Sequence, residues 1–154
     1  MSAISSTYSF VDTAGSLTNP ILGNAPIVFA GEIGMGEFEV EMTTPRTTHD
    51  KAADGTIMPS YIAGDNGRVR IKVQQTSVLY KQLLGLYNAL LVAAATGDVS
   101  NWANSSLFLR NTVDGSQHIC EGVSFEKIPN KTYGAEGAQF TWDLMACSIQ
   151  NLAV

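Results

Sequence analysis

Three glutamates alternate with three apolar residues in residues 36–42, GEFEVEM. Successive side chains of a strand point to opposite faces, so Glu37, Glu39 and Glu41 form one row and the apolar residues form the other. Two catalytic carboxylates of a glycosidase flank the bond they cleave, at ~5–10 Å from each other, whereas neighbours on one strand point in parallel. Calcium takes ligands that converge from a loop. The row therefore predicts neither site, and it faces either solvent or a partner.

A basic row of the same length follows further along the chain. In residues 68–74, RVRIKVQ, Arg68, Arg70 and Lys72 alternate with three apolar residues. Opposite charges on neighbouring strands pair across a sheet. The two rows could pair within one chain or between copies of it. Neither arrangement is catalytic.

Few other residues could carry chemistry. His49 and Asp50 stand in a polar segment, and His118 lies far from them in sequence, whereas a zinc site takes three or four ligands. Cys120 and Cys147 have no metal-binding spacing, and we expect reduced thiols packed in sheets. We therefore predict no catalytic residue, no metal site and no cofactor.

Length and composition favour one domain that does not bind nucleic acid stably. A chain of 154 residues is the size of a single domain with its own core. Its net charge of −5 argues against a grip on phosphates, which needs clustered Lys and Arg. Only 15% of the residues are charged, so much of the surface is polar and uncharged or covered by partners.

Alternation and turn signals predict about eight strands. They lie in residues 7–11, 16–18, 37–43, 56–62, 68–74, 106–111, 117–125 and 139–149. Residues 12–15 are expected to turn the first strand back, and residues 19–36 and 43–55 to be loops, the second of them extended. Residues 65–67, DNG, and residues 114–115, DG, are typical of hairpin turns, which need positive φ. An apolar register change at Met145 predicts a bulge.

One helix is expected between a cap at Thr76 or Ser77 and a stop at Gly97. Its apolar residues recur at helical spacing, and polar residues interrupt it too often for a membrane span. The apolar surface covers most of its circumference, so the helix either sits deep in the domain or is partly covered by a neighbour. Hairpin-connected strands with one helix predict a mainly β fold, an antiparallel β-sandwich or partly closed barrel with one flanking α-helix.

A series of short motifs stands in order along nearly the whole chain. It comprises ADGTIM at 53–58, Ala63-Gly64, GRVRI at 67–71, Thr76-Ser77 at the helix start, VSFEKIP at 123–129, and Gly137 with Phe140 and Trp142. Each motif alone is weak, but their order and spacing resemble those of the tail tube proteins of long-tailed bacteriophages, including a group found with contractile tails. Residues 19–36 and 150–154 depart from that pattern.

This resemblance implies a structural virion protein and no enzyme. Such proteins share their fold with the tube protein of type VI secretion, and they form hexameric rings that stack into a hollow tube. The tube would conduct the genome into the host, with transient, non-specific passage of DNA. The implied partners are further copies of the chain, the sheath protein, the baseplate and the tail terminator, with no membrane. The implied location is the virion, after assembly in the bacterial host cytoplasm.

Two surfaces gain a role from the resemblance. The two charged rows would face the lumen and pair with each other there, so that the remaining acids make the channel negative. The residues of the two rows are Glu37, Glu39, Glu41, Arg68, Arg70 and Lys72. The extended loop would be an arm that reaches a neighbouring subunit or the next ring, formed by Thr44, Pro45, Arg46, Thr47, Thr48, His49, Asp50 and Lys51. The alternative function is a monomeric β-sandwich that binds carbohydrate or another small ligand, which predicts a concave aromatic patch.

Overall fold

The computed structural model describes residues 7–23, 25–30 and 34–153, which form ten strands and one α-helix. Two 3-10 turns, Phe10–Asp12 and Pro20–Leu22, lie near the start of the chain. The α-helix is α1 (Val78–Ala95). The strands are β1 (Thr13–Thr18), β2 (Ile27–Ala30), β3 (Met35–Met42), β4 (Thr47–Lys51), β5 (Ile57–Tyr61), β6 (Gly67–Gln74), β7 (Ser105–Asn111), β8 (Ser116–Lys127), β9 (Gln139–Ala146) and β10 (Ser148–Ala153).

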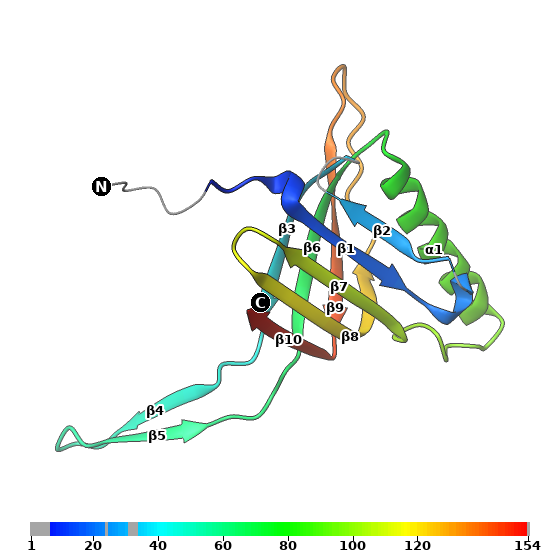
Figure 1. Ribbon diagram of the computed structural model, residues 1–154. Helices are drawn as coiled ribbons and strands as arrows, with labels where there is room; N and C mark the ends of the chain where they lie inside the picture. The colour runs from blue at the N-terminus through cyan, green and yellow to red at the C-terminus, as the bar shows by residue number, and fades with distance from the viewer. Residues whose placement is uncertain (1–6, 24, 31–33, 154) are drawn as a thin grey trace.

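Eight of these strands form one antiparallel sheet that folds over into two layers. The order is β2-β1-β7-β8-β9-β6-β3, and β10 pairs with β8 off this path. Strand β8 belongs to both layers: its first half pairs with β7 and β10, and its last residues pair with β9. In Figure 1 the layer of β2, β1, β7, β8 and β10 crosses in front of the layer of β3, β6 and β9, with α1 at one side. The predicted mainly antiparallel fold with one helix is confirmed, and the sheet is open rather than a closed barrel.

The core lies between the two layers and under α1. Alternate residues of β6 are fully buried, as the sequence pattern predicts, and so are alternate residues of β9. Trp142 of β9 lies in an aromatic cluster, with its ring centroid 5.5 Å from that of Phe125 and 6.3 Å from that of Tyr87. The helix contributes Leu79, Leu83, Leu86 and Leu90.

The helix begins and ends where the sequence predicts. The Ser77 hydroxyl accepts a hydrogen bond from the Tyr80 backbone N–H at 3.1 Å, and Gly97 takes a φ of 92° just beyond the end. The length and composition of α1 would allow it to cross a membrane, but its leucine face is packed into the core. On the other side Val78, Leu91 and Val92 are exposed. The sequence left open whether the helix lies deep in the domain or is partly covered by a neighbour, and these exposed residues exclude a deeply buried helix.

The predicted first strand, residues 7–11, is wrong. A 3-10 turn occupies Phe10–Asp12, and residues 13–18 form one uninterrupted strand between β2 and β7. Gly15 is not in the predicted turn but within β1, where its small size allows a close approach of two strands. A Cβ at Gly15 would lie 2.1 Å from the Phe108 carbonyl oxygen.

The loop predicted for residues 19–36 contains regular structure. Asn19 caps the 3-10 turn Pro20–Leu22 by accepting the Ile21 N–H at 2.9 Å, and β2 then pairs with β1. Strand β3 already begins at Met35. Residues 24 and 31–33 of this segment, and Val154 at the end of the chain, lie outside the described residues.

The hairpin predicted at residues 65–67 does not form, whereas the one at 114–115 does, with Gly115 at a φ of 76°. Strand β5 pairs with β4 instead of β6, so residues 43–55 are no simple loop but contain one strand of a separate hairpin. Gly67 has no positive φ. It is the first residue of β6, and a Cβ there would lie 2.3 Å from the Glu41 carbonyl oxygen.

The bulge predicted at Met145 is a corner instead. Strand β9 ends at Ala146, and β10 starts at Ser148 and pairs with a different strand. The Cys147 N–H donates to the carbonyl oxygens of Glu121 and Gly122, and Gly122 takes a φ of 64°. Cys147 is therefore exposed at a corner, and only Cys120 is a thiol packed within a sheet, as predicted.

Candidate functional site

The two charged rows lie opposite each other on neighbouring strands. The register aligns Glu37 with Lys72, Glu39 with Arg70, and Glu41 with Arg68. Lys72 Nζ lies 3.3 Å from Glu37 Oε2, and Arg70 Nη1 lies 2.9 Å from Glu39 Oε1 and 3.1 Å from Glu41 Oε2. The expectation that the rows pair is confirmed, and of the two arrangements left open the structure has the one within a single chain.

Two further carboxylates belong to this network, and sequence reasoning missed both. Arg70 Nε lies 3.4 Å from Asp143 Oδ1 on β9, and Arg68 Nη2 lies 3.3 Å from Glu126 Oε1 on β8. Asp143 could have been found, because it is the one acid between the buried residues of β9. The network contains five carboxylates and three cations, so its formal charge is −2.

Arg70 is the centre of this network. Partial desolvation favours its neutral form, but the negative charges of Glu39, Glu41 and Asp143 outweigh it and raise the pKa of the Arg70 guanidinium above its ordinary value. The side chains are partly exposed, so the pairs add little to stability. Their chemistry is that of an acidic polar face on the surface.

This face covers the four-stranded layer β3-β6-β9-β8, whose two edge strands have no hydrogen-bonded neighbour on their outer side among the described residues. Among the described residues, β3 pairs only with β6, and residues 124–127 of β8 pair only with β9. Each neighbouring pair in the order β3-β6-β9-β8 is antiparallel. Strands β3 and β8 therefore run in opposite directions. An unpaired edge exposes backbone N–H and C=O groups that can pair with another chain.

Strands β4 and β5 form a separate hairpin, the arm, that leaves the body between β3 and β6 (Figure 1). Thr44, Pro45 and Arg46 lead into it, and Arg46 forms an ion pair with Asp65 at its base. Every residue of both strands is exposed. At its tip, the Asp54 carboxylate accepts the Thr56 backbone N–H at 2.9 Å, and this bond lowers the pKa of Asp54.

The register of the arm separates its side chains into two faces. Thr47, His49 and Lys51 of β4 lie opposite Tyr61, Pro59 and Ile57 of β5, so these six residues share one face. Thr48, Asp50, Met58 and Ser60 share the other face. His49 and Asp50 thus point to opposite sides, and His118 lies on β8 in the body. Within the part of the chain that the structure describes, no three His, Cys, Asp or Glu side chains are grouped to hold a metal ion.

The chain matches the family model described as Bacteriophage PhiTE tail tube protein over residues 5–153. No curated protein matches it in sequence.

Solved structures show the same fold at low sequence identity. A chain of the sheath-tube complex of PVC, an extracellular contractile injection system, in its extended state is 10% identical, with a TM-score of 0.60. The alignment covers 99% of this chain and 95% of that one. A chain from the baseplate of the anti-feeding prophage is 11% identical, with a TM-score of 0.61 and coverage of 98% and 99%. A chain from the tube terminating cap of the same particle is 8% identical, with a TM-score of 0.58 and coverage of 100% and 96%.

Proposed function

The chain belongs to the bacteriophage PhiTE tail tube protein family, and from this we propose that six copies close into a ring and that rings stack into the tube of a phage tail. The protein is then a structural part of the virion and has no catalytic role. The observation that carries the proposal is the four-stranded layer β3-β6-β9-β8, which has an unpaired edge on each side.

Ring closure follows from the directions of these two edges. Strand β3 of one copy and residues 124–127 of the next copy run antiparallel when the layers are placed side by side. If these two strands pair, the antiparallel order of the strands within one chain continues into the next copy. The same contact repeated around a closed circle leaves neither edge of this layer exposed, which removes a site of aggregation.

The charged face of this layer would then line the lumen. The network has a formal charge of −2, and Lys127, which lies opposite Asp143 in the register, leaves −1 for each copy. Six copies thus give a negative wall, which repels phosphates and lets DNA slide. A basic wall would instead retain DNA, because bound phosphates release their counterions. The internal ion pairs are compatible with this role, since they prevent Arg68, Arg70 and Lys72 from acting as free cations.

The arm and the outer surface would supply the remaining contacts. The arm projects from the body with no buried residue in either strand, so it is suited to contact another copy, in the same ring or the next. Structures of similar fold come from a sheath-tube complex, a baseplate and a tube terminating cap. We extend this to the chain itself and assign it a sheath, a baseplate and a terminator as partners, with assembly in the cytoplasm of the host.

Negative-stain electron microscopy of the purified protein, with sedimentation velocity over a range of concentrations, tests the proposal. Rings with a central hole, and tubes at higher concentration, are the expected particles. A monomer that stays compact and unassociated at every concentration would contradict the proposal and favour the alternative of a monomeric binding module.

A further inference from the structure

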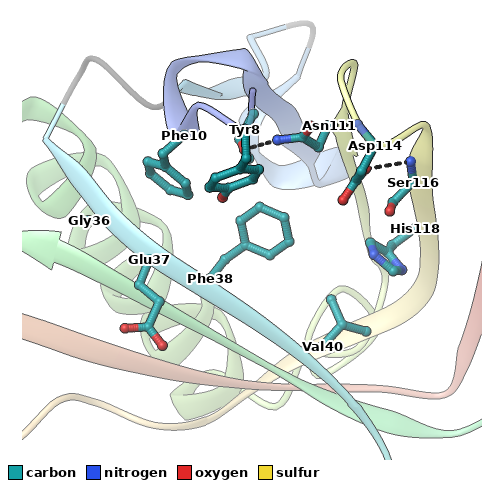
Figure 2. Close-up of a pocket in the computed structure, with 11 residues that line it drawn as sticks. Tyr8, Phe10, Gly36, Glu37, Phe38, Val40, Asn111, Asp114, Ser116 and His118 are labelled. Atoms are coloured by element: carbon teal, nitrogen blue, oxygen red, sulfur yellow. Dashed lines mark hydrogen bonds between the residues drawn. The ribbon is translucent and has the colours of Figure 1, made fainter. Parts of the chain in front are cut away.

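An open hollow lies beside β3, between the start of the chain and the β7–β8 hairpin (Figure 2). Its volume is about 490 Å³. Apolar side chains of Tyr8, Phe10, Phe38 and Val40 line it, and the rings of Phe10 and Phe38 have centroids 6.4 Å apart. Figure 2 shows the aromatic rings on one side of the hollow and Asp114, Ser116 and His118 of the hairpin on the other.

One side of the hollow carries an acid, Asp114. Glu37 also borders the hollow, but its carboxylate points away from it (Figure 2) and pairs with Lys72 at 3.3 Å. The Asp114 carboxylate accepts the Ser116 backbone N–H at 2.8 Å. This bond, together with one from the Ser116 side chain, lowers the pKa of Asp114, so the group is ionised at neutral pH. The hollow therefore suits an apolar group that carries a cation beside it.

One face of the arm has this combination. It carries Ile57 and Tyr61, which are 52% and 79% exposed, with Pro59 between them. The same face carries Lys51 and His49 from β4, whereas the acidic Asp50 lies on the other face. A two-stranded hairpin is only marginally stable alone in water, so an arm with an exposed apolar row is suited to be covered by another surface.

The hollow and the arm lie toward opposite ends of β3. The hollow contacts Gly36, Phe38 and Val40, whereas the chain enters the arm only after Met42, the last residue of β3. In Figure 1 the arm extends away from the body, so it does not fold back over its own hollow. A contact that joins opposite ends of identical molecules closes into a ring or repeats along an axis, according to the rotation between copies. The edges of β3 and β8 already close the ring in the proposed function, so we assign the contact of the arm to the axis.

We propose that the face of the arm formed by Ile57, Pro59, Tyr61, His49 and Lys51 binds in the aromatic hollow of a second copy of the chain, in the adjacent ring. The apolar row covers Tyr8, Phe10 and Phe38, and Lys51 lies near Asp114. This inference rests on the proposed function, because it assigns the axial contact of the tube. The lateral contact through β3 and β8 is independent of it.

The experiment cross-links two proteins, each with one exposed cysteine, within assembled tubes. Both carry Cys147→Ser, which removes the exposed thiol, while Cys120 is buried. One carries His49→Cys on the apolar face of the arm, and the other carries Ser116→Cys at the hollow. The matched control replaces His49→Cys by Thr48→Cys, whose side chain is on the opposite face. These changes leave Ile57, Tyr61 and the aromatic residues of the hollow in place.

A short bismaleimide should join the His49→Cys and Ser116→Cys proteins at least about tenfold more efficiently than the control, because docked thiols meet at a high effective concentration. In parallel, Ile57→Ser with Tyr61→Ser should raise the concentration needed for tube formation about tenfold or more, whereas Met58→Ser on the other face should not.

The outcomes separate the two proposals. Tubes that form without the selective cross-link, or that tolerate Ile57→Ser with Tyr61→Ser, overturn the docking of the arm in the hollow but leave the tube function intact. An oligosaccharide that binds the hollow of assembled tubes also overturns it, because the hollow would then be free. A wild-type chain that forms neither rings nor tubes overturns both.

Discussion

Removing the arm should separate folding from assembly. The natural cut lies at its base, where the Ile62 backbone N–H donates to the Arg46 carbonyl oxygen at 2.9 Å. Residues 47–61 can therefore be replaced by Asn-Gly, a dipeptide that favours a tight hairpin turn. The variant keeps β3, β6 and the whole core, since no residue of β4 or β5 belongs to the core.

The expected change in folding stability follows from the same observations. Every residue of the two strands is exposed, and a single surface substitution usually changes the free energy of unfolding by under about 0.5 kcal/mol, so removing the strands should cost little. Each halving of a loop lowers its closure cost by about 0.6 kcal/mol, so the shorter connection adds at most about 2 kcal/mol of stability. The variant should thus be as stable as the wild type, or slightly more stable.

Urea unfolding followed by circular dichroism measures the folding stability, and electron microscopy at matched protein concentration measures tube assembly. The variant should unfold at the same or a higher urea concentration and form no tubes. Tubes of normal length from this variant would refute the reasoning on the arm. A free energy of unfolding lower than that of the wild type by more than about 2 kcal/mol would refute the claim that the core folds independently of the arm.

Three further predictions test the charged face, the core and the thiols. Replacing the three β3 glutamates with lysine changes the formal charge of the network from −2 to +4, so the tubes should retain DNA. The logarithm of the binding constant should fall with the logarithm of the salt concentration with a slope of about −2.7, from three new phosphate contacts. Normal ejection of DNA would contradict the lumen role. Leu83→Ala should cost about 2–5 kcal/mol in urea unfolding because Leu83 is fully buried, whereas Leu91→Ala on the exposed side of α1 should cost under about 1 kcal/mol. Burial raises the pKa of Cys120 to about 11, so a maleimide at about pH 8 should modify one thiol per folded chain, Cys147, and two in denaturant.

The strongest periodic signals in the sequence predicted their elements correctly. The alternation in β3 and β6 predicted both strands and the pairing of their charged rows, because one-sided burial fixes which residues face the core. The leucine spacing and the Ser77 cap predicted α1 for the same reason.

Glycine produced the main errors. The sequence predicts turns at Gly15 and Gly67, but both lie in strands where another strand approaches closely, and sequence alone does not distinguish these two uses of glycine. The pairing of β4 with β5 was missed because neither strand has a buried face that would impose alternation.

The candidate surfaces were only partly predictable. The alternation of the sequence predicts the two charged rows. It does not predict that Asp143 and Glu126 pair with them, because these two acids lie on strands distant in sequence. The hollow combines residues from three separate segments, so no local pattern could indicate it. Its aromatic lining is the concave patch expected for a binding module, but we propose that the arm of a second copy occupies it.

A cryo-electron microscopy reconstruction of the assembled protein tests the central claim most directly, since it shows which strands meet between copies. The account predicts a closed ring in which β3 of each copy pairs antiparallel with residues 124–127 of its neighbour, with Glu37, Glu39 and Glu41 facing the channel. A ring whose copies meet through other surfaces and leave β3 unpaired, or whose channel is lined by the opposite layer, would contradict it.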